Sequence, residues 1–228
     1  MMTSRAGTFD GMRAVAPLLI GVAPFGLILG VTAAGSEIGG RLGYATSLII
    51  FAGAAQLATV QLIDAGSAAA VVIATTLVIN ARHLMYSAAL APHFRDFPAR
   101  WRLGLPYILT DQAFVISITR FNEDTTPEYK RWFYTGGAMS LFVTWQVTTA
   151  TGVILGASVP ESWSLDFAIP LVFLALLIPA LRDRPAAVAA VVGGAVAVLA
   201  HDVQYNLGLM IGALAGILTG VAAERLAE

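Results

Sequence analysis

The sequence predicts an all-α polytopic membrane protein with about eight transmembrane segments (seven to eight). Of the 228 residues, 57% are hydrophobic and only 12% are charged, and the mean hydropathy is +0.77. A soluble domain carries about 25% charged residues, so this chain lacks the polar surface that water would require on every side. The apolar residues also occur in runs of about 20, which is the length of a helix that crosses a bilayer.

Eight such runs follow one another, and we expect each to be one helix, because a helix satisfies its own backbone hydrogen bonds in lipid. Short connections between the runs predict a single integral membrane domain over residues 1–228. The seventh run is short, and we expect it to be tilted, partial or re-entrant. The expected spans are Ala14–Ala34, Gly43–Ile63, Ser67–Leu90, Leu103–Ile118, Trp132–Gly156, Leu165–Leu181, Ala186–Ala200 and Asn206–Ala222.

Basic residues in the loops predict the orientation, because Lys and Arg are enriched on the cytoplasmic side of a membrane. With eight spans and the N-terminus inside, eight basic residues lie inside and four outside. The N-terminus is therefore expected to be cytoplasmic. Three of the four outer arginines lie in the segment His93–Arg102, so either the rule is violated locally or the third or fourth segment does not cross completely.

Two similar segments predict an inverted repeat. Ala16–Ile20 reads APLLI and precedes Pro24, whereas Ile169–Phe173 reads IPLVF and precedes Pro179. In the eight-span arrangement the two segments run in opposite directions, as in transporters that are built from inverted-topology repeats. Proline-rich membrane helices are common, so coincidence is the alternative.

The first span is expected to be a broken helix at residues 21–26, which read GVAPFG. Pro24 lacks an N–H group, and its ring clashes with the carbonyl of Ile20. A broken membrane helix offers free carbonyls and a half-helix terminus to the charged groups of a solute. Pro24, Phe25 and Gly26 are therefore candidate substrate-binding residues, and a kink that serves packing is the alternative.

Polar residues in the third span form a second candidate site. Asn80 and His83 belong to one helical stripe, because their spacing matches a helical turn, and Arg82 lies on the same helix. An arginine at this depth costs at least ~2.5 kcal/mol on insertion scales, so it needs a partner or water. Asn80, Arg82 and His83 are candidate substrate-binding residues. The alternatives are that Arg82 snorkels to an interface or makes a purely structural ion pair.

Asp111 is a carboxylate well inside the otherwise apolar fourth span, with Gln112 beside it. We expect Asp111 to carry a coupling proton, to pair with Arg82 or to bind an ammonium group. His83 is the second candidate for the coupling proton. Gln56 follows a run of small residues that permits close helix approach, so it is a candidate for substrate binding or for packing alone.

Several function classes find no support in the sequence. The net charge of −1 removes an electrostatic case for nucleic acid binding. No cysteine is present, and the three histidines lack zinc-ligand spacing. Neither a phosphate-binding loop nor a G-x-S-x-G motif occurs. We therefore expect no catalytic residues, no metal and no cofactor, and the residual enzymatic alternative is an intramembrane enzyme that uses Asp111 and His83.

Four motifs resemble those of the AzlC family, the large subunits of branched-chain amino acid exporters. They occur in order in the first half of the chain and include the candidate residues named above. Residues 166–171 (DFAIPL) also resemble the family, whereas the last two spans do so mainly in length and composition. The motifs are GVAPFG at 21–26, FAGAAQ at 51–56, NARHLMY at 80–86 and LTDQAF at 109–114.

The resemblance implies a secondary transporter subunit that exports branched-chain amino acids or related small metabolites across the bacterial inner (cytoplasmic) membrane. It also implies a small AzlD-type membrane subunit as partner. We expect transport to be coupled to protons through Asp111 or His83. The alternatives are a channel-like subunit, for which no selectivity-filter sequence is visible, and a scaffold subunit of a membrane complex.

Overall fold

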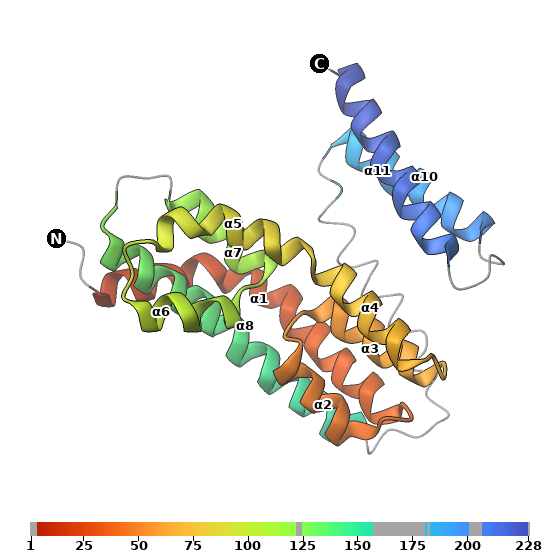
Figure 1. Cartoon of the computed structure of the whole chain (residues 1–228), viewed down its shortest axis with the longest axis horizontal. Helices are drawn as coiled ribbons and strands as arrows, with labels where there is room; N and C mark the ends of the chain where they lie inside the picture. Colours follow the sequence, from red (N-terminus) through yellow and green to blue (C-terminus); the bar gives the residue numbers. More distant parts are fainter. Residues whose placement is uncertain (1–3, 122–124, 157–180, 182, 201–206, 228) are drawn as a thin grey trace. The chain divides into compact units, whose positions relative to one another are not determined.

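The computed structural model describes residues 4–121, 125–156, 181, 183–200 and 207–227. Every regular element among these residues is a helix, which confirms the predicted all-α membrane class. The chain falls into two compact units, Met1–Ala168 and Ile169–Glu228, and each unit is taken separately (Figure 1).

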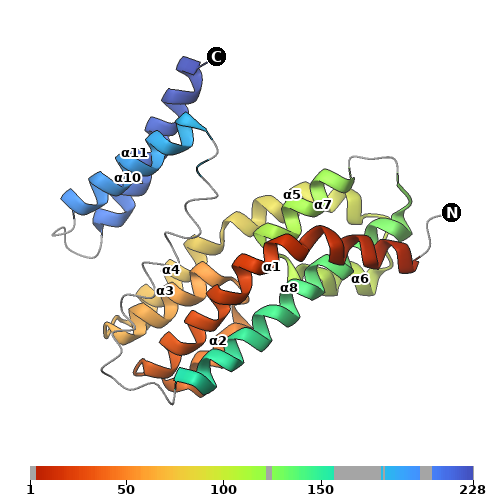
Figure 2. The same ribbon diagram turned by 180° about the vertical axis from the view of Figure 1, so that it is seen from behind.

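Two long helices run side by side through the first unit: α1 (Ser4–Gly35) and α8 (Pro127–Gly156) (Figure 2). They point in the same direction, because Gly7 packs beside Trp132 near their starts and Gly156 packs beside Ala34 near their ends. With 32 and 30 residues at about 1.5 Å per residue, both exceed the ~30 Å hydrocarbon core. We call the side on which α1 and α8 begin the start side, and the other the end side.

Glycines allow the backbones of α1 and α8 to approach closely. A Cβ added to Gly30 would collide with the carbonyl oxygen of Thr149, and one added to Gly152 would collide with that of Leu27. Small residues give membrane helices this close packing, which replaces the hydrophobic driving force that is missing in lipid.

The predicted break at residues 21–26 is not observed, because α1 continues through both Pro17 and Pro24. Membrane helices tolerate a proline when neighbouring groups satisfy the backbone group that it frees. Gly26 serves packing instead, since a Cβ at this position would collide with the side chain of Thr148 on α8.

A broken helix does occur in the third predicted span. It consists of α4 (Ala69–Asn80) and α5 (Arg82–Phe94), with an interruption at Ala81. Together they form one of the helices in the described part of the chain that are long and apolar enough to cross a membrane; the others are α1 and α8. The predicted count of eight spans is therefore not confirmed.

The second predicted span, Gly43–Ile63, is a hairpin of two short helices, α2 (Gly39–Ile49) and α3 (Gly53–Asp64). The outer ends meet, because the backbone N–H of Glu37 donates to Asp64 Oδ1 at 2.8 Å. At the turn between the helices, Phe51 has a φ of 36°, a left-handed conformation that is costly for a bulky residue. We call this element the 39–64 hairpin; it enters and leaves on the end side.

The fourth predicted span, Leu103–Ile118, also turns back. Its tip reaches the middle of α8, where the rings of Tyr107 and Phe142 are 6.0 Å apart. Its two ends lie near the start of α8, where Trp101 contacts Trp132 and Phe121 contacts Phe133. We call this element the 99–121 hairpin; it consists of α6 (Ala99–Gly104), the 3-10 helix η1 (Leu105–Ile108) and α7 (Asp111–Phe121).

The tips of the two hairpins meet beside the middle of α8. The Phe51 ring packs against Phe142, with centroids 5.0 Å apart, and stacks on Tyr107 at 6.5 Å. The Tyr107 hydroxyl donates to the carbonyl of Leu48. Figure 1 shows α5, α6 and α7 around the start side of α1 and α8, and α2, α3 and α4 around the end side.

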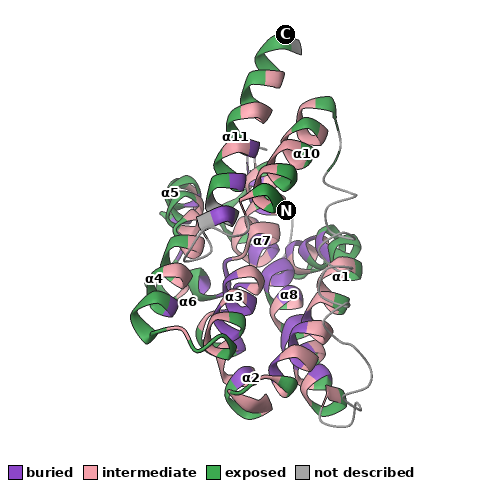
Figure 3. Cartoon of the chain, turned by 90° about the vertical axis from the view of Figure 1, so that its right-hand side faces the viewer, coloured by how far each residue is buried: buried purple, intermediate pink, exposed green. Residues whose placement is uncertain are grey.

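Buried residues of the first unit gather on the faces that α1, α3, α7 and α8 present to one another (Figure 3). On the start side, the buried Tyr129 joins three of these helices: its hydroxyl donates to Asp10 Oδ2 at 2.7 Å and accepts from Arg120 Nη2 at 3.0 Å. The start side is thus held together by hydrogen bonds in addition to apolar packing.

The second unit contains the antiparallel helices α10 (Arg184–Leu199) and α11 (Leu207–Ala227). Gly193 packs against Gly212 and Gly216. These helices confirm the helical character of the seventh and eighth predicted spans. The sixth predicted span, apart from Leu181, lies outside the described residues, and so does the second segment of the predicted inverted repeat.

Candidate functional site

The interruption of α4–α5 and the tip of the 99–121 hairpin bring two opposite charges together. Arg82 Nη1 lies 2.9 Å from Asp111 Oδ2. Each residue is the first of its helix, α5 or α7, and a carboxylate is favoured at a helix N-terminus. The Thr110 hydroxyl accepts a hydrogen bond from the N–H of Ala113 at 3.2 Å and caps α7.

The ion pair is partly accessible, because the Arg82 and Asp111 side chains are 34% and 37% exposed. Around it, three buried polar atoms have no hydrogen-bond partner among the described residues: Asn80 Oδ1, Arg82 Nε and Asp111 Oδ1. Buried polar atoms are normally paired. The surroundings of the pair therefore keep free hydrogen-bonding capacity for a polar ligand or for water.

His83 and two aromatic residues form the surroundings of the pair. The Nδ1 atom of His83 lies 3.2 Å from the carbonyl oxygen of Asn80, and its ring meets the edge of Tyr86 at 5.8 Å. Tyr86 stacks on Phe114, with centroids 4.4 Å apart and planes at 15°. This stack joins α5 to α7 one helical turn beyond the charges.

Tyr86 and Phe114 were not among the predicted substrate-binding residues. Helical periodicity contains the signal for both: Tyr86 lies four residues after Arg82, and Phe114 three residues after Asp111, the spacings at which side chains share a helix face.

The other candidates lie in a different environment, around Trp145 of α8. Gln56 is fully buried; its Nε2 donates to Thr46 Oγ1 at 2.9 Å, and its Oε1 accepts from Trp145 Nε1 at 3.2 Å. The Phe25 ring packs on Trp145 with centroids 5.5 Å apart. These contacts hold the tip of the 39–64 hairpin against α1 and α8.

The structure therefore joins some of the sequence-predicted residues and separates others. Asn80, Arg82, His83 and Asp111 form one cluster, with the half-buried Gln112 next to Asp111. Three of the remaining candidates belong to the packing around α1 and α8, namely Phe25, Gly26 and Gln56. The fourth, Pro24, lies on the exposed side of α1.

Comparisons with known proteins agree with the sequence motifs. The family model described as AzlC protein matches residues 17–159, which include both hairpins and the ion pair. An "Uncharacterized membrane protein" of Archaeoglobus fulgidus is 33% identical over 214 residues, which cover 89% of this chain and 89% of the relative. "Inner membrane protein YgaZ" of Escherichia coli is 23% identical over 230 residues, covering 93% and 89%. No solved structure matches the chain. Because the family model covers more than half of the sequence, the chain belongs to the AzlC protein family.

Proposed function

We propose that this chain is the large subunit of a secondary transporter that exports branched-chain amino acids or related small metabolites. The observation that carries the proposal is the Arg82–Asp111 ion pair, placed where an interrupted helix meets the tip of a hairpin. Interrupted helices near the bilayer midplane form the substrate and ion sites of many transporters. Membership of a family of membrane proteins supports the same class of function.

The chemistry of the pair suits a zwitterion. An amino acid placed between the two side chains gives its carboxylate to Arg82 and its ammonium to Asp111, so one ion pair is exchanged for two. Every charge then has a partner. An unpaired charge would cost several kcal/mol in a low-dielectric site. The free Asn80 Oδ1 accepts a further ammonium hydrogen, and the free Arg82 Nε donates to the carboxylate. The Tyr86–Phe114 stack offers an apolar wall to the branched side chain.

Proton coupling follows from competition for one carboxylate. Asp111 binds either the substrate ammonium or a proton. A proton that arrives from outside the cell displaces the substrate there, and the protonated carrier then returns the proton to the inside. Such competition is antiport, which drives export against a gradient. His83, whose ring contacts Tyr86 beside the pair, is the second candidate for the coupling proton.

The hairpins suit alternating access to such a site. The 39–64 hairpin approaches the middle of α8 from the end side and the 99–121 hairpin from the start side. Movement of either tip would open the site to one side only. Phe25, Gly26 and Gln56 then act by holding the tip of the 39–64 hairpin, with Pro24 in the same turn of α1, whereas Gln112 lies next to the carboxylate.

The distribution of basic residues supports a cytoplasmic N-terminus in the bacterial inner membrane. Because the two hairpins do not cross, the segment His93–Arg102 lies on the same side as the N-terminus, which removes the conflict with the charge rule. In the first unit, the end side carries Arg41, whereas the start half carries Arg5, Arg13, Arg95, Arg100, Arg102, Arg120, Lys130 and Arg131.

The test is proton-dependent valine efflux from cells that coexpress this chain with a small AzlD-type subunit, the proposed partner. Asp111→Asn removes the charge that binds ammonium or proton, so efflux should be abolished while the protein still assembles in the membrane. The matched control is Asp64→Asn, at the outer end of the 39–64 hairpin, where an amide oxygen still accepts the hydrogen bond from Glu37. Full efflux by Asp111→Asn would remove Asp111 from coupling, and robust efflux by the chain alone would contradict the two-subunit proposal.

A further inference from the structure

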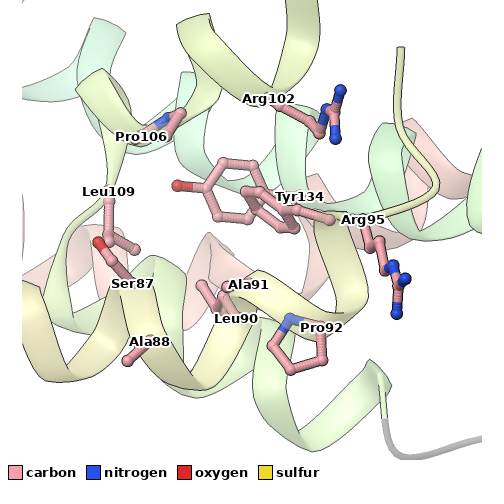
Figure 4. Close-up of a pocket in the computed structure, with 11 residues that line it drawn as sticks. Ser87, Ala88, Leu90, Ala91, Pro92, Arg95, Arg102, Pro106, Leu109 and Tyr134 are labelled. Carbon is pink, nitrogen blue, oxygen red and sulfur yellow. The ribbon is translucent and has the colours of Figure 1, made fainter. Parts of the chain in front are cut away.

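A pocket of about 600 Å³ lies between α5 and the 99–121 hairpin, on the start side of the ion pair (Figure 4). Its volume is within the range of small-molecule sites, which is ~300–1,000 Å³. Most of its wall is apolar and comes from α5, η1 and α8. Figure 4 places Arg95 and Arg102 toward one end and Ser87 and Leu109 toward the other.

The pocket extends from the start-side surface toward the ion pair. Arg95 immediately follows α5, whose first residue is Arg82, and the helical stretch between them is about 20 Å long. At the inner end, Ser87 lies in the second turn of α5, and Leu109 precedes Thr110 and Asp111. The inner end of the pocket therefore lies about five residues along α5 from Arg82 and two residues before Asp111.

The charge in the pocket is positive and unpaired. Arg95 and Arg102 are exposed and have no ion pair among the described residues. The buried hydroxyl of Tyr134 is already committed, because it donates to the carbonyl of Leu105 at 3.2 Å. The pocket thus combines an apolar wall with two cations, which attract a carboxylate and accept an aliphatic side chain.

On the opposite side of the pair, the end side, side chains pack against one another. At the tip of the 39–64 hairpin, Phe51 and Ala52 are 5% and 6% exposed, and the Phe51 ring packs on Phe142. On the end side of the pair, the Thr59 and Thr76 hydroxyls join α3 to α4 at 2.8 Å.

We infer that this pocket is a water-filled entry through which a carboxylate-bearing solute reaches Arg82 from the start side, with Arg95 and Arg102 attracting the carboxylate at its mouth. The inference rests on the proposed transport function and adds the route and its charge selection. The same two cations would also bind the phosphate of an anionic lipid. The experiment distinguishes a solute carboxylate from a lipid phosphate as the group that occupies the pocket.

The natural absence of cysteine makes single-cysteine labelling direct. Ala91→Cys places a thiol in the pocket, and Ala89→Cys places one on the exposed surface of the same helix outside the pocket. Both are exposed to membrane-impermeant methanethiosulfonate reagents, one anionic and one cationic, in inside-out and right-side-out vesicles. The measured quantity is the rate of labelling with each reagent.

Ala91→Cys should be labelled at least tenfold faster than Ala89→Cys, because Ala89 lies on the exposed face of a candidate membrane span, where lipid excludes charged reagents. Labelling of Ala91→Cys should occur from the start side and should be faster with the anionic than with the cationic reagent. Adding Arg95→Gln and Arg102→Gln should lower the anionic-to-cationic ratio about tenfold, because two cations no longer concentrate the anion. Equal, slow labelling of both cysteines would mean a pocket filled by lipid and would overturn the inference. A charge ratio unchanged by the arginine substitutions would do the same. The labelling rates test the pocket and do not depend on valine transport. The proposed transport function is tested separately, by valine efflux of the Asp111→Asn variant.

Discussion

At the scale of single residues, the chain uses its buried polar groups in two ways. Around Trp145, the amide of Gln56 is engaged at both ends, to Thr46 and to the indole N–H. Around Arg82, by contrast, Asn80 Oδ1 and Asp111 Oδ1 are buried without a partner in the part of the chain that the structure describes. A group with all its hydrogen bonds made within the protein stabilises the fold, whereas an unpaired buried group costs stability until water or a ligand pairs with it.

This difference predicts opposite outcomes for two alanine substitutions. Gln56→Ala leaves the indole N–H of Trp145 buried without an acceptor, which should destabilise the protein by about 1–3 kcal/mol. Asn80→Ala removes an oxygen that makes no hydrogen bond to the described residues, so stability should change by less than ~0.5 kcal/mol. Valine efflux should fall at least tenfold, because a hydrogen bond to a charged ammonium contributes ~1.5–3 kcal/mol. Thermal unfolding in detergent and efflux in cells measure the two quantities. Unchanged efflux by Asn80→Ala would remove this residue from the site.

At the scale of helices, hydropathy predicted where apolar segments lie but not where they reverse. A span and a hairpin of two half-helices have the same length of apolar sequence, and the difference resides in a few backbone angles. At Phe51 the chain reverses with a positive φ. Bulky residues rarely adopt this conformation, so a phenylalanine in the sequence does not predict a reversal. The sequence did contain one indication: the arginines of His93–Arg102 conflict with the charge rule unless the third or fourth segment fails to cross. The fourth segment is the one that turns back.

The ion pair shows the same division between what sequence can and cannot predict. Arg82 and Asp111 are identified by their charge in apolar segments, because lipid makes such charges costly. Their partnership was one of several predicted alternatives, since it depends on how the 99–121 hairpin folds back onto α5. The break predicted at Pro24 is wrong: proline weakens a helix locally, but α1 is continuous through Pro24, and Gly26, half a turn later, packs closely against Thr148 of α8.

The hairpins predict a topology that differs from eight sequential spans. Ala68, before α4, should lie on the side opposite the N-terminus, and Ala99, at the start of α6, on the same side. Single Ala68→Cys and Ala99→Cys variants, labelled with an impermeant thiol reagent in oriented vesicles, distinguish the arrangements. Eight sequential spans would give the reverse pattern, with Ala99 on the far side, and that result would disprove the hairpins.

At the scale of the first unit, α1 and α8 form a glycine-packed pair against which the hairpins and the α4–α5 helix are arranged. The two hairpin tips and the α4–α5 interruption lie near the middle of the long helices. The start side has the pocket and most of the positive charge. The proposed carrier, with its site at the middle and the pocket on one side, agrees with this arrangement.

Valine counterflow with the doubly neutral variant Arg82→Gln/Asp111→Asn is the most direct test of the ion pair as the transport site. Neutralising both partners of this half-buried pair leaves neither charge without its counterion, so the protein should fold and assemble. Reconstituted with the small subunit, the unmodified chain should show trans-stimulated valine uptake, which an open pore does not show. The double variant should show none. Counterflow at the unmodified level in a correctly assembled double variant would mean that the pair is only structural and that the substrate binds elsewhere.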